Sequence, residues 1–244
     1  MLLKLGSKND DVKTLQIKLG LKPDGDFGSI TEKSVKEWQK KNGLTPDGVV
    51  GDTTWNKMFG ETQKINEDVV ISSVDGLNID KLKGHIPDSV LLQIPDTTKK
   101  FNITSNLRLA HFLGQCAHES GDWKYRVEIA SGKAYEGRKD LGNIQEGDGV
   151  RFKGRGYIQL TGRVNYGKFS TFIGEDCVSE PDLVANKYPL ASAAFFFNSN
   201  KLWTICDQGF TDEIVTKVTK RVNGGTNGLE DRLKKFKIYY NLLK

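Results

Sequence analysis

Glu119 is the first residue whose type and position suggest chemistry. It lies near the end of residues 107–128, where Leu109, Phe112 and Cys116 recur at helical spacing. Its carboxylate should stand at the edge of the stripe that faces the core. An ionised carboxylate removed from water must be paired with a cation or stay protonated, and a protonated carboxyl can act as a general acid. A structural ion pair at a helix end fits this segment equally well.

Glu128 is a candidate for a second catalytic carboxylate, nine residues further on. On one straight helix the two glutamates would face opposite sides, about 13 Å apart along the axis. Gly121 and Asp122 supply a helix stop, so the chain can turn and bring Glu128 back across a groove. Inverting glycosidases need such a pair, roughly 6.5–9.5 Å apart with a water between. On spacing alone Glu136 is an equal candidate.

Composition limits the class of protein. With 244 residues and 37% hydrophobic content, the chain suits one large domain or two smaller ones. The N-terminus enters charged residues without an apolar segment, and apolar runs are short. We therefore expect no signal peptide and no stable membrane insertion. Cys116, Cys177 and Cys206 are widely spaced without a CxxC, which predicts buried free thiols.

Charge and histidine content narrow the partners. The net charge of +5 is spread along the chain and only slightly favours an anionic polymer or surface. Without zinc-finger spacing or an RNA-binding aromatic motif, we expect no nucleic-acid partner. The histidines are His85, His111 and His118, and Asp122 stands where an HExxH motif needs its second histidine. We therefore expect no metal and no cofactor.

Residues 1–60 contain an internal repeat. Residues 24–31 and 47–54 both read D-G-x-(F/V)-G-x-x-T, in which Asp-Gly pairs favour tight turns. Amphipathic helical patterns lie before and between these turns, so a small three-helix unit is predicted. Trp38 and Trp55 lie on apolar stripes and are expected in the core rather than as sugar platforms.

The rest of the chain is divided by a polar segment. Residues 61–76 are predicted to be a linker, and residues 77–244 a catalytic domain. Tyr135 lies in a loop-rich piece that could line a groove. In residues 151–166, Gln, Thr, Asn and Tyr stand beside glycines, as sugar sites require, although the Gly-Arg-Gly also suits a hairpin turn. Three further helices are predicted: Pro189–Trp203, Thr211–Val222 and a basic amphipathic one, Leu229–Leu243.

Two family resemblances follow from these motifs. LGSKNDDVKTLQIKLG, PDGDFGSITEKSVKEWQKKNGL and PDGVVGDTTWNKMF resemble the peptidoglycan-binding-1 family. AHESG, FKGRGYIQLTGRVNY and VNGG, in this order, resemble glycoside hydrolase family 19, in its phage lysozyme branch more than its plant chitinase branch. The resemblances imply a mainly α fold: a three-helix wall-binding domain and a larger lysozyme-like, α-rich (α+β) catalytic domain.

The family 19 resemblance also implies roles for single residues. It makes Glu119 the general acid and Glu128 the general base, and it gives Thr161 the hydroxyl that helps hold the nucleophilic water. Together with Tyr135, the residues expected at the substrate are Gln159, Asn165, Asn223 and Arg232. Arg232 matches an arginine linked electrostatically to the catalytic carboxylates. The chain lacks a Glu shortly after VNGG, where family chitinases have one.

The predicted function is hydrolysis of β-1,4 bonds in peptidoglycan by inversion, as a monomeric phage endolysin of muramidase type. Without an export signal, the resemblance implies accumulation in the host bacterial cytoplasm until a holin-type lesion admits the enzyme to the periplasm and cell wall. Three alternatives stay open. They are a chitinase acting on N-acetylglucosamine polymers, a zinc amidase or peptidase of the wall, and a non-catalytic wall-binding protein.

Overall fold

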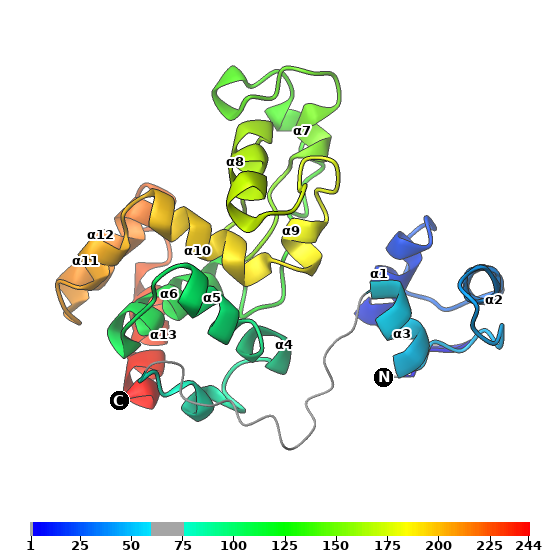
Figure 1. Ribbon diagram of the computed structural model, residues 1–244, viewed down its shortest axis with the longest axis horizontal. Helices are drawn as coiled ribbons and strands as arrows, with labels where there is room; N and C mark the ends of the chain where they lie inside the picture. Colours follow the sequence, from blue (N-terminus) through cyan, green and yellow to red (C-terminus); the bar gives the residue numbers. More distant parts are fainter. Residues whose placement is uncertain (1, 60–75) are drawn as a thin grey trace. The chain divides into compact units, whose positions relative to one another are not determined.

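The computed structural model describes residues 2–59 and 76–244, and the chain divides into two compact units, residues 1–69 and 70–244 (Figure 1). Helices dominate both units, which confirms the predicted mainly α fold. Of the predicted linker 61–76, only Gly76 lies within the described residues. No helix in the described ranges is both long and apolar enough to cross a membrane.

The N-terminal unit contains three helices, as predicted: α1 (Asp10–Lys18), α2 (Ser29–Lys41) and α3 (Asp52–Phe59). Its small core is formed by Leu3, Val12, Leu15, Phe27, Val35, Val50 and Met58. Trp38 and Trp55 are partly buried and pack against this core, in keeping with a structural role.

A buried glutamine organises the first turn of the repeat. The Gln16 side chain is 2% exposed, and its Nε2 donates to Asp24 Oδ1 (2.7 Å), the Asp26 carbonyl (2.9 Å) and Thr31 Oγ1 (3.2 Å). Its Oε1 accepts from the Gly25 amide at 2.9 Å. Hydrogen bonds from the Asp26 amide and from Gln16 lower the pKa of the Asp24 carboxyl. The side-chain amide of Gln16 on α1 therefore forms hydrogen bonds with three residues of the turn and with the start of α2.

Gln39 repeats this arrangement 23 residues later. It makes the same four contacts, at 2.8, 2.9, 3.2 and 2.9 Å, with Asp47, Val49, Thr54 and Gly48. The sequence repeat is thus a structural repeat, in which a glutamine on a helix holds the following Asp-Gly turn and the next helix start.

The larger unit is a set of short helices around a long, buried one. In chain order these are η1 (Ile79–Leu82), α4 (Asp88–Leu91), α5 (Ile94–Lys100), α6 (Asn106–Glu119), η2 (Lys133–Tyr135), η3 (Lys139–Leu141), α7 (Asp148–Arg151), α8 (Arg163–Ile173), α9 (Leu183–Asn186), α10 (Pro189–Ser199), α11 (Trp203–Cys206), α12 (Asp212–Asn223) and α13 (Leu229–Leu243). Within the described residues, β-pairing is limited to isolated bridges such as Val127 with Arg155.

Helix α6 forms the centre of this unit because nine consecutive residues of it, 109–117, are buried. Ser105 caps it by accepting from the Arg108 amide (3.2 Å). Gly114 lets α13 approach closely, since a Cβ there would lie 3.1 Å from the Phe236 backbone. The His111 ring stacks on Phe236 with centroids 4.2 Å apart. Figure 1 shows α13 passing beside α6.

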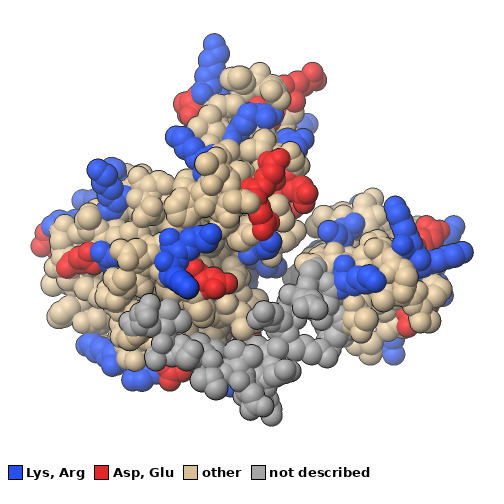
Figure 2. Space-filling view, in the orientation of Figure 1, with Lys and Arg blue, Asp and Glu red and all other residues tan. Residues whose placement is uncertain are grey.

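Of the three further helices predicted from the sequence, two are present as α12 and α13, and the third differs. The segment expected as one helix, residues 189–203, forms α10 and α11 instead, separated near Lys201, whose φ is +55°. Thr211 caps α12, and Gly224 ends it in a left-handed conformation. The cysteines are free and buried, as predicted, and burial raises the pKa of the Cys116 thiol. Figure 2 shows acidic and basic side chains interspersed on both units.

Candidate active site

The chain turns sharply after Glu119, the last residue of α6. Gly121, Asp122 and Trp123 follow with φ values of +58°, +59° and +69°, three successive left-handed residues. For a residue with a side chain this conformation costs about 1–2 kcal/mol. The predicted helix stop is therefore present, and the turn directs the chain away from the α6 axis.

Glu119 is paired with a cation, which is one of the two states expected from the sequence. Arg232 Nη2 lies 2.5 Å from Glu119 Oε1, and the Glu119 side chain is 25% exposed. Arg232 Nη1 donates to Gln115 Oε1 (2.5 Å), and its Nε donates to the Asn227 carbonyl (3.1 Å). The family resemblance implied an electrostatic link between Arg232 and the catalytic carboxylates, and the structure has this ion pair with Glu119. At 2% exposure Arg232 is buried, although it was also expected among the residues at the substrate.

Helix α13 holds the end of α6 at two further points. His118 Nδ1 lies 2.6 Å from Asp231 Oδ2, so His118, the residue before Glu119, has a structural partner on α13. The ammonium group of Lys235 contacts the Asp122 carboxylate within the left-handed turn. Because Asp231 and Lys235 flank Arg232 on α13, the position of Glu119 depends on the packing of this one helix.

Glu128 is held by a different set of donors. Tyr135 Oη donates to Glu128 Oε1 (3.0 Å), and the Gly154 amide donates to Oε2 (3.0 Å). The Glu128 amide donates to the Gly154 carbonyl at 2.9 Å, which aligns the two backbones. Burial, and then the hydrogen bond to Glu128, raise the pKa of Tyr135, so its hydroxyl remains a donor at neutral pH.

Glu136, the rival second carboxylate, has a structural environment. Its Oε1 accepts from the Gly147 amide (2.7 Å) and its Oε2 from the Gly149 amide (2.8 Å), at the start of α7. A carboxylate at a helix N-terminus satisfies amides that lack partners within the helix. Glu136 therefore holds the start of α7 through two backbone amides, whereas Glu128 accepts from the Tyr135 side chain, and Glu128 stays the predicted second catalytic carboxylate.

The Gly-Arg-Gly segment is a tight turn that also presents polar side chains. Arg155 and Leu160 exchange backbone hydrogen bonds, as in a hairpin turn. Gln159 has a φ of +50°, and a Cβ on Gly154 would lie 2.6 Å from Gln159 Oε1 and 3.2 Å from Glu128 Oε2. A side chain at position 154 would therefore displace the ends of the Gln159 and Glu128 side chains, which both lie against Gly154.

Thr161 and Asn165 continue this polar group. Thr161 Oγ1 donates to the Gln159 carbonyl (2.9 Å), and Asn165 Nδ2 donates to the Thr161 carbonyl (2.7 Å). The Thr161 oxygen keeps lone pairs that can accept from a water.

Asn223 lies with the other carboxylate. Its Nδ2 donates to the Asn227 carbonyl (3.0 Å), which also accepts from Arg232, and its Oδ1 accepts from the Gly225 amide (2.8 Å). Asn223 thus closes the turn before α13.

The predicted residues therefore form two groups: Glu119 with Arg232 and Asn223, and Glu128 with Tyr135, Gln159, Thr161 and Asn165. The segment between the glutamates connects them. Trp123 packs edge-on against Tyr157 with centroids 5.1 Å apart, and the Gly156 amide donates to the Arg126 carbonyl (2.8 Å).

Sequence reasoning did not identify two residues of this site. Gln115 contacts Arg232 and also donates to Thr219 Oγ1 (3.1 Å), which joins α6 to α12. Its signal was a polar side chain four residues before Glu119, on the same helix face. Gly154, the amide donor to Glu128, had only its place in a glycine-rich loop as a signal.

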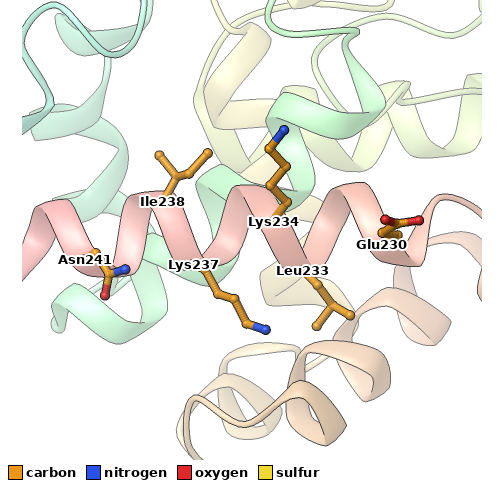
Figure 3. A pocket seen from close by; sticks show the side chains of 6 residues that line it. All are labelled: Glu230, Leu233, Lys234, Lys237, Ile238 and Asn241. Carbon is orange, nitrogen blue, oxygen red and sulfur yellow. The ribbon is translucent and has the colours of Figure 1, made fainter.

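Two shallow hollows lie outside both groups. One, of about 440 Å³, covers the outer face of α13 (Figure 3). It is lined by Glu230, Leu233, Lys234, Lys237, Ile238 and Asn241. The other, of about 240 Å³, lies in the N-terminal unit beside the first repeat turn and the start of α2. Among the described residues, no cluster of three His, Cys, Asp or Glu side chains could hold a metal ion.

Two family models match the chain. Residues 8–58 match the peptidoglycan binding domain, and residues 96–208 match class I chitinases of glycoside hydrolase family 19. Glu119, Glu128 and the 151–166 segment all lie within the second match.

Relatives and a solved structure agree with these models. A glycosyl hydrolase family 19 domain-containing protein of Haemophilus influenzae is 28% identical over 67% of this chain and 94% of its own length. An endochitinase of Arabidopsis thaliana is 36% identical over 48% of this chain and 39% of its own length. The class IV chitinase of Zea mays superposes with a TM-score of 0.52 at 20% identity, covering 80% of this chain and 92% of its own. The chain therefore contains an N-terminal peptidoglycan-binding domain, matched over residues 8–58, and a glycoside hydrolase family 19 domain, matched over residues 96–208.

Proposed function

We propose that the chain is a lysozyme-type endolysin that hydrolyses β-1,4 glycosidic bonds of peptidoglycan with inversion. The observation that carries this proposal is the joining of a peptidoglycan-binding domain to a family 19 unit that holds two glutamates in separate polar environments. A binding protein without activity would not need either arrangement.

Glu119 acts as the general acid in this proposal. Arg232 engages Oε1, while Oε2 has no hydrogen-bond partner among the described residues, so Oε2 is the oxygen left to face the glycosidic oxygen. When the proton passes to the glycosidic oxygen, Arg232 stabilises the carboxylate left behind. Gln115 and Asn227 fix the guanidinium, so this stabilisation needs no rearrangement.

Glu128 acts as the general base. Both of its oxygens accept hydrogen bonds, as those of an ionised carboxylate do. Such a carboxylate removes a proton from a water that attacks the anomeric carbon opposite the leaving group. Thr161 Oγ is positioned by the Gln159 carbonyl and supplies a second contact for that water.

Chitin hydrolysis is the second candidate, because several similar curated proteins are endochitinases. The N-terminal domain favours peptidoglycan over chitin. A phage origin and release into the wall from the producing cell's cytoplasm are further parts of the proposal. They rest on the sequence resemblance to phage lysozymes.

Mass spectrometry of the products from purified sacculi tests the proposal. Digestion should yield fragments with a muramic acid reducing end, and EDTA should not change their amount. Glucosamine reducing ends would establish a glucosaminidase. Free stem peptides whose release stops with EDTA and resumes with zinc would establish a metal-dependent amidase instead.

A further inference from the structure

The segment from residue 122 to residue 137, which contains Glu128, has an uneven distribution of free charge. It holds three acidic and three basic residues, so its formal charge is balanced. Each acid is engaged: Asp122 by Lys235, Glu128 by Tyr135 and Gly154, and Glu136 by backbone amides. Their capacity to attract a cation from solution is therefore reduced.

The three basic side chains of this segment are exposed and unpaired. Lys124, Arg126 and Lys133 reach solvent, and none forms an ion pair with any described residue. We call these three residues the basic rim. Three arginines of the same region are instead paired with carboxylates, Arg138 with Asp140, Arg155 with Asp182 and Arg163 with Asp148. Arg151 and Lys153 donate to backbone carbonyls.

Arg126 is the rim residue best placed near the reaction. Val127 bridges Arg155, the Arg126 carbonyl accepts from Gly156, and the Glu128 amide donates to Gly154. Arg126 and Glu128 thus stand on either side of the bridged Val127, at most about 7 Å apart along the backbone.

We propose that the basic rim binds carboxylates of the peptide stems on peptidoglycan and so selects this anionic glycan over neutral N-acetylglucosamine polymers. This inference rests on the proposed function. Stem peptides project from the glycan backbone, so their carboxylates can reach cations beside the cleavage point, whereas a neutral polymer offers the rim no charge. Unpaired cations beside Glu128 can attract the carboxylates of an anionic substrate and so favour its binding.

The test compares two double variants with wild type. Arg126→Gln with Lys133→Gln removes two rim charges. Lys99→Gln with Lys100→Gln removes the same charge from the exposed last turn of α5. The substrates are sacculi freed of phosphodiester-linked polymers, the same sacculi with carboxylates amidated by carbodiimide and ammonium, and N-acetylglucosamine hexamer. Initial rates are measured at low and high salt.

The rim variant should lower the ratio of the sacculus rate to the hexamer rate roughly fivefold at low salt, as two exposed charge contacts allow. The α5 variant should keep the wild-type ratio. Amidation should lower the wild-type rate on sacculi and remove most of its difference from the rim variant, and high salt should do the same.

An equal ratio for the rim variant and wild type would overturn the inference while leaving peptidoglycan hydrolysis intact. A difference between the rim variant and wild type that persists on amidated sacculi would also overturn it, because the rim would then not act by binding carboxylates. If wild type cleaves the hexamer but not sacculi, the proposed function itself falls, and the two failures are thus distinguished.

Discussion

Glu119 and Glu128 differ in the chemistry of the groups that hold them. Glu119 forms an ion pair with the buried guanidinium of Arg232. Glu128 accepts hydrogen bonds from a tyrosine hydroxyl and a backbone amide. Replacing one glutamate should therefore disturb a different set of neighbours from replacing the other, and the two variants should fail in different ways.

Glu119→Gln removes the proposed proton donor and retains the shape of the side chain, so glycan cleavage should fall by several orders of magnitude.

Glu128→Gln removes the proposed base, and azide should partly replace the activated water. The azide product should have the inverted anomeric configuration, which NMR can establish. A retained configuration would contradict the inverting mechanism.

Glu136→Gln is the control for these variants. It should keep cleavage near wild type and lower the free energy of unfolding by about 1 kcal/mol. A glutamine side chain has only one oxygen, so it cannot accept from both the Gly147 and the Gly149 amide as the two oxygens of Glu136 do. If it abolishes cleavage while Glu128→Gln remains active, with both folded by circular dichroism, Glu136 is the base.

Arg232→Gln leaves the Glu119 carboxylate without its cation. Unfolding in urea should show a loss of about 3 kcal/mol, the range for breaking one partner of a buried pair, and kcat should fall more than KM changes. Arg232→Lys keeps the charge but has a single side-chain nitrogen in place of the three that contact Asn227, Gln115 and Glu119, so it should recover only part of kcat. A change confined to KM would indicate that Arg232 contacts substrate.

Residue roles could be predicted where a motif carried them and not where tertiary contacts decide them. The sequence identified Glu119, Glu128 and Thr161 as candidates from motifs. It could not choose between Glu128 and Glu136, because that choice depends on which backbone amides each oxygen meets. It also gave no sign that the Arg232 side chain would be buried. The partner of Arg232, Glu119, lies 113 residues earlier in the chain.

At the scale of elements, the contact between α6 and α13 determines the geometry around Glu119. It includes a buried histidine, His111, whose Nε2 lies 2.9 Å from the Gly209 carbonyl. Burial lowers the pKa of His111 to about 4, although the Gly209 contact opposes the shift. The native packing therefore requires a neutral imidazole.

This requirement predicts a dependence of stability on pH. Between pH 6.5 and about 4, the unfolded chain binds a proton at His111 that the native state does not, so stability is present above pH 6.5 and is lost as the pH falls. The loss should reach about 3 kcal/mol at most. Urea unfolding of wild type and His111→Gln at pH 7 and pH 5 should show a smaller change for the variant.

His85 is the matched control, because its side chain is exposed. His85→Gln should keep the pH dependence of wild type. If His111→Gln retains the full wild-type dependence, the loss of stability comes from other groups.

Helix positions were largely predictable from periodicity and end signals. Leu229–Leu243 and the stop after Glu119 both follow from local chemistry. The break between α10 and α11 was missed because the apolar pattern continues through it, while the backbone turns at Lys201. A continuous pattern indicates burial, but it does not show where the chain changes direction.

For the whole molecule, the two-unit organisation predicts a division of labour. Deleting residues 1–60 should lower binding to sacculi in a pull-down assay while hydrolysis of short soluble glycans survives, because a tethered module raises the local concentration of the enzyme on the polymer. Equal pull-down by both proteins would mean that the N-terminal unit does not bind the wall.

The architecture could be predicted further than the substrate. Repeats, turn residues and helical periodicity indicated two mainly α parts, and the structure has them. The bond that is cut depends on how a sugar lies between Glu119 and Glu128, which rests on contacts far apart in the sequence.

The long separation between Glu119 and Arg232 also affects the timing of synthesis. The arginine is translated 113 residues after the glutamate, and at about 5–20 residues per second this delay lasts roughly 6–23 s. During that interval α6 lacks the helix that fixes its end. A nascent or prematurely terminated chain thus has Glu119 without its cation, and the ion pair can form only after synthesis has passed Arg232.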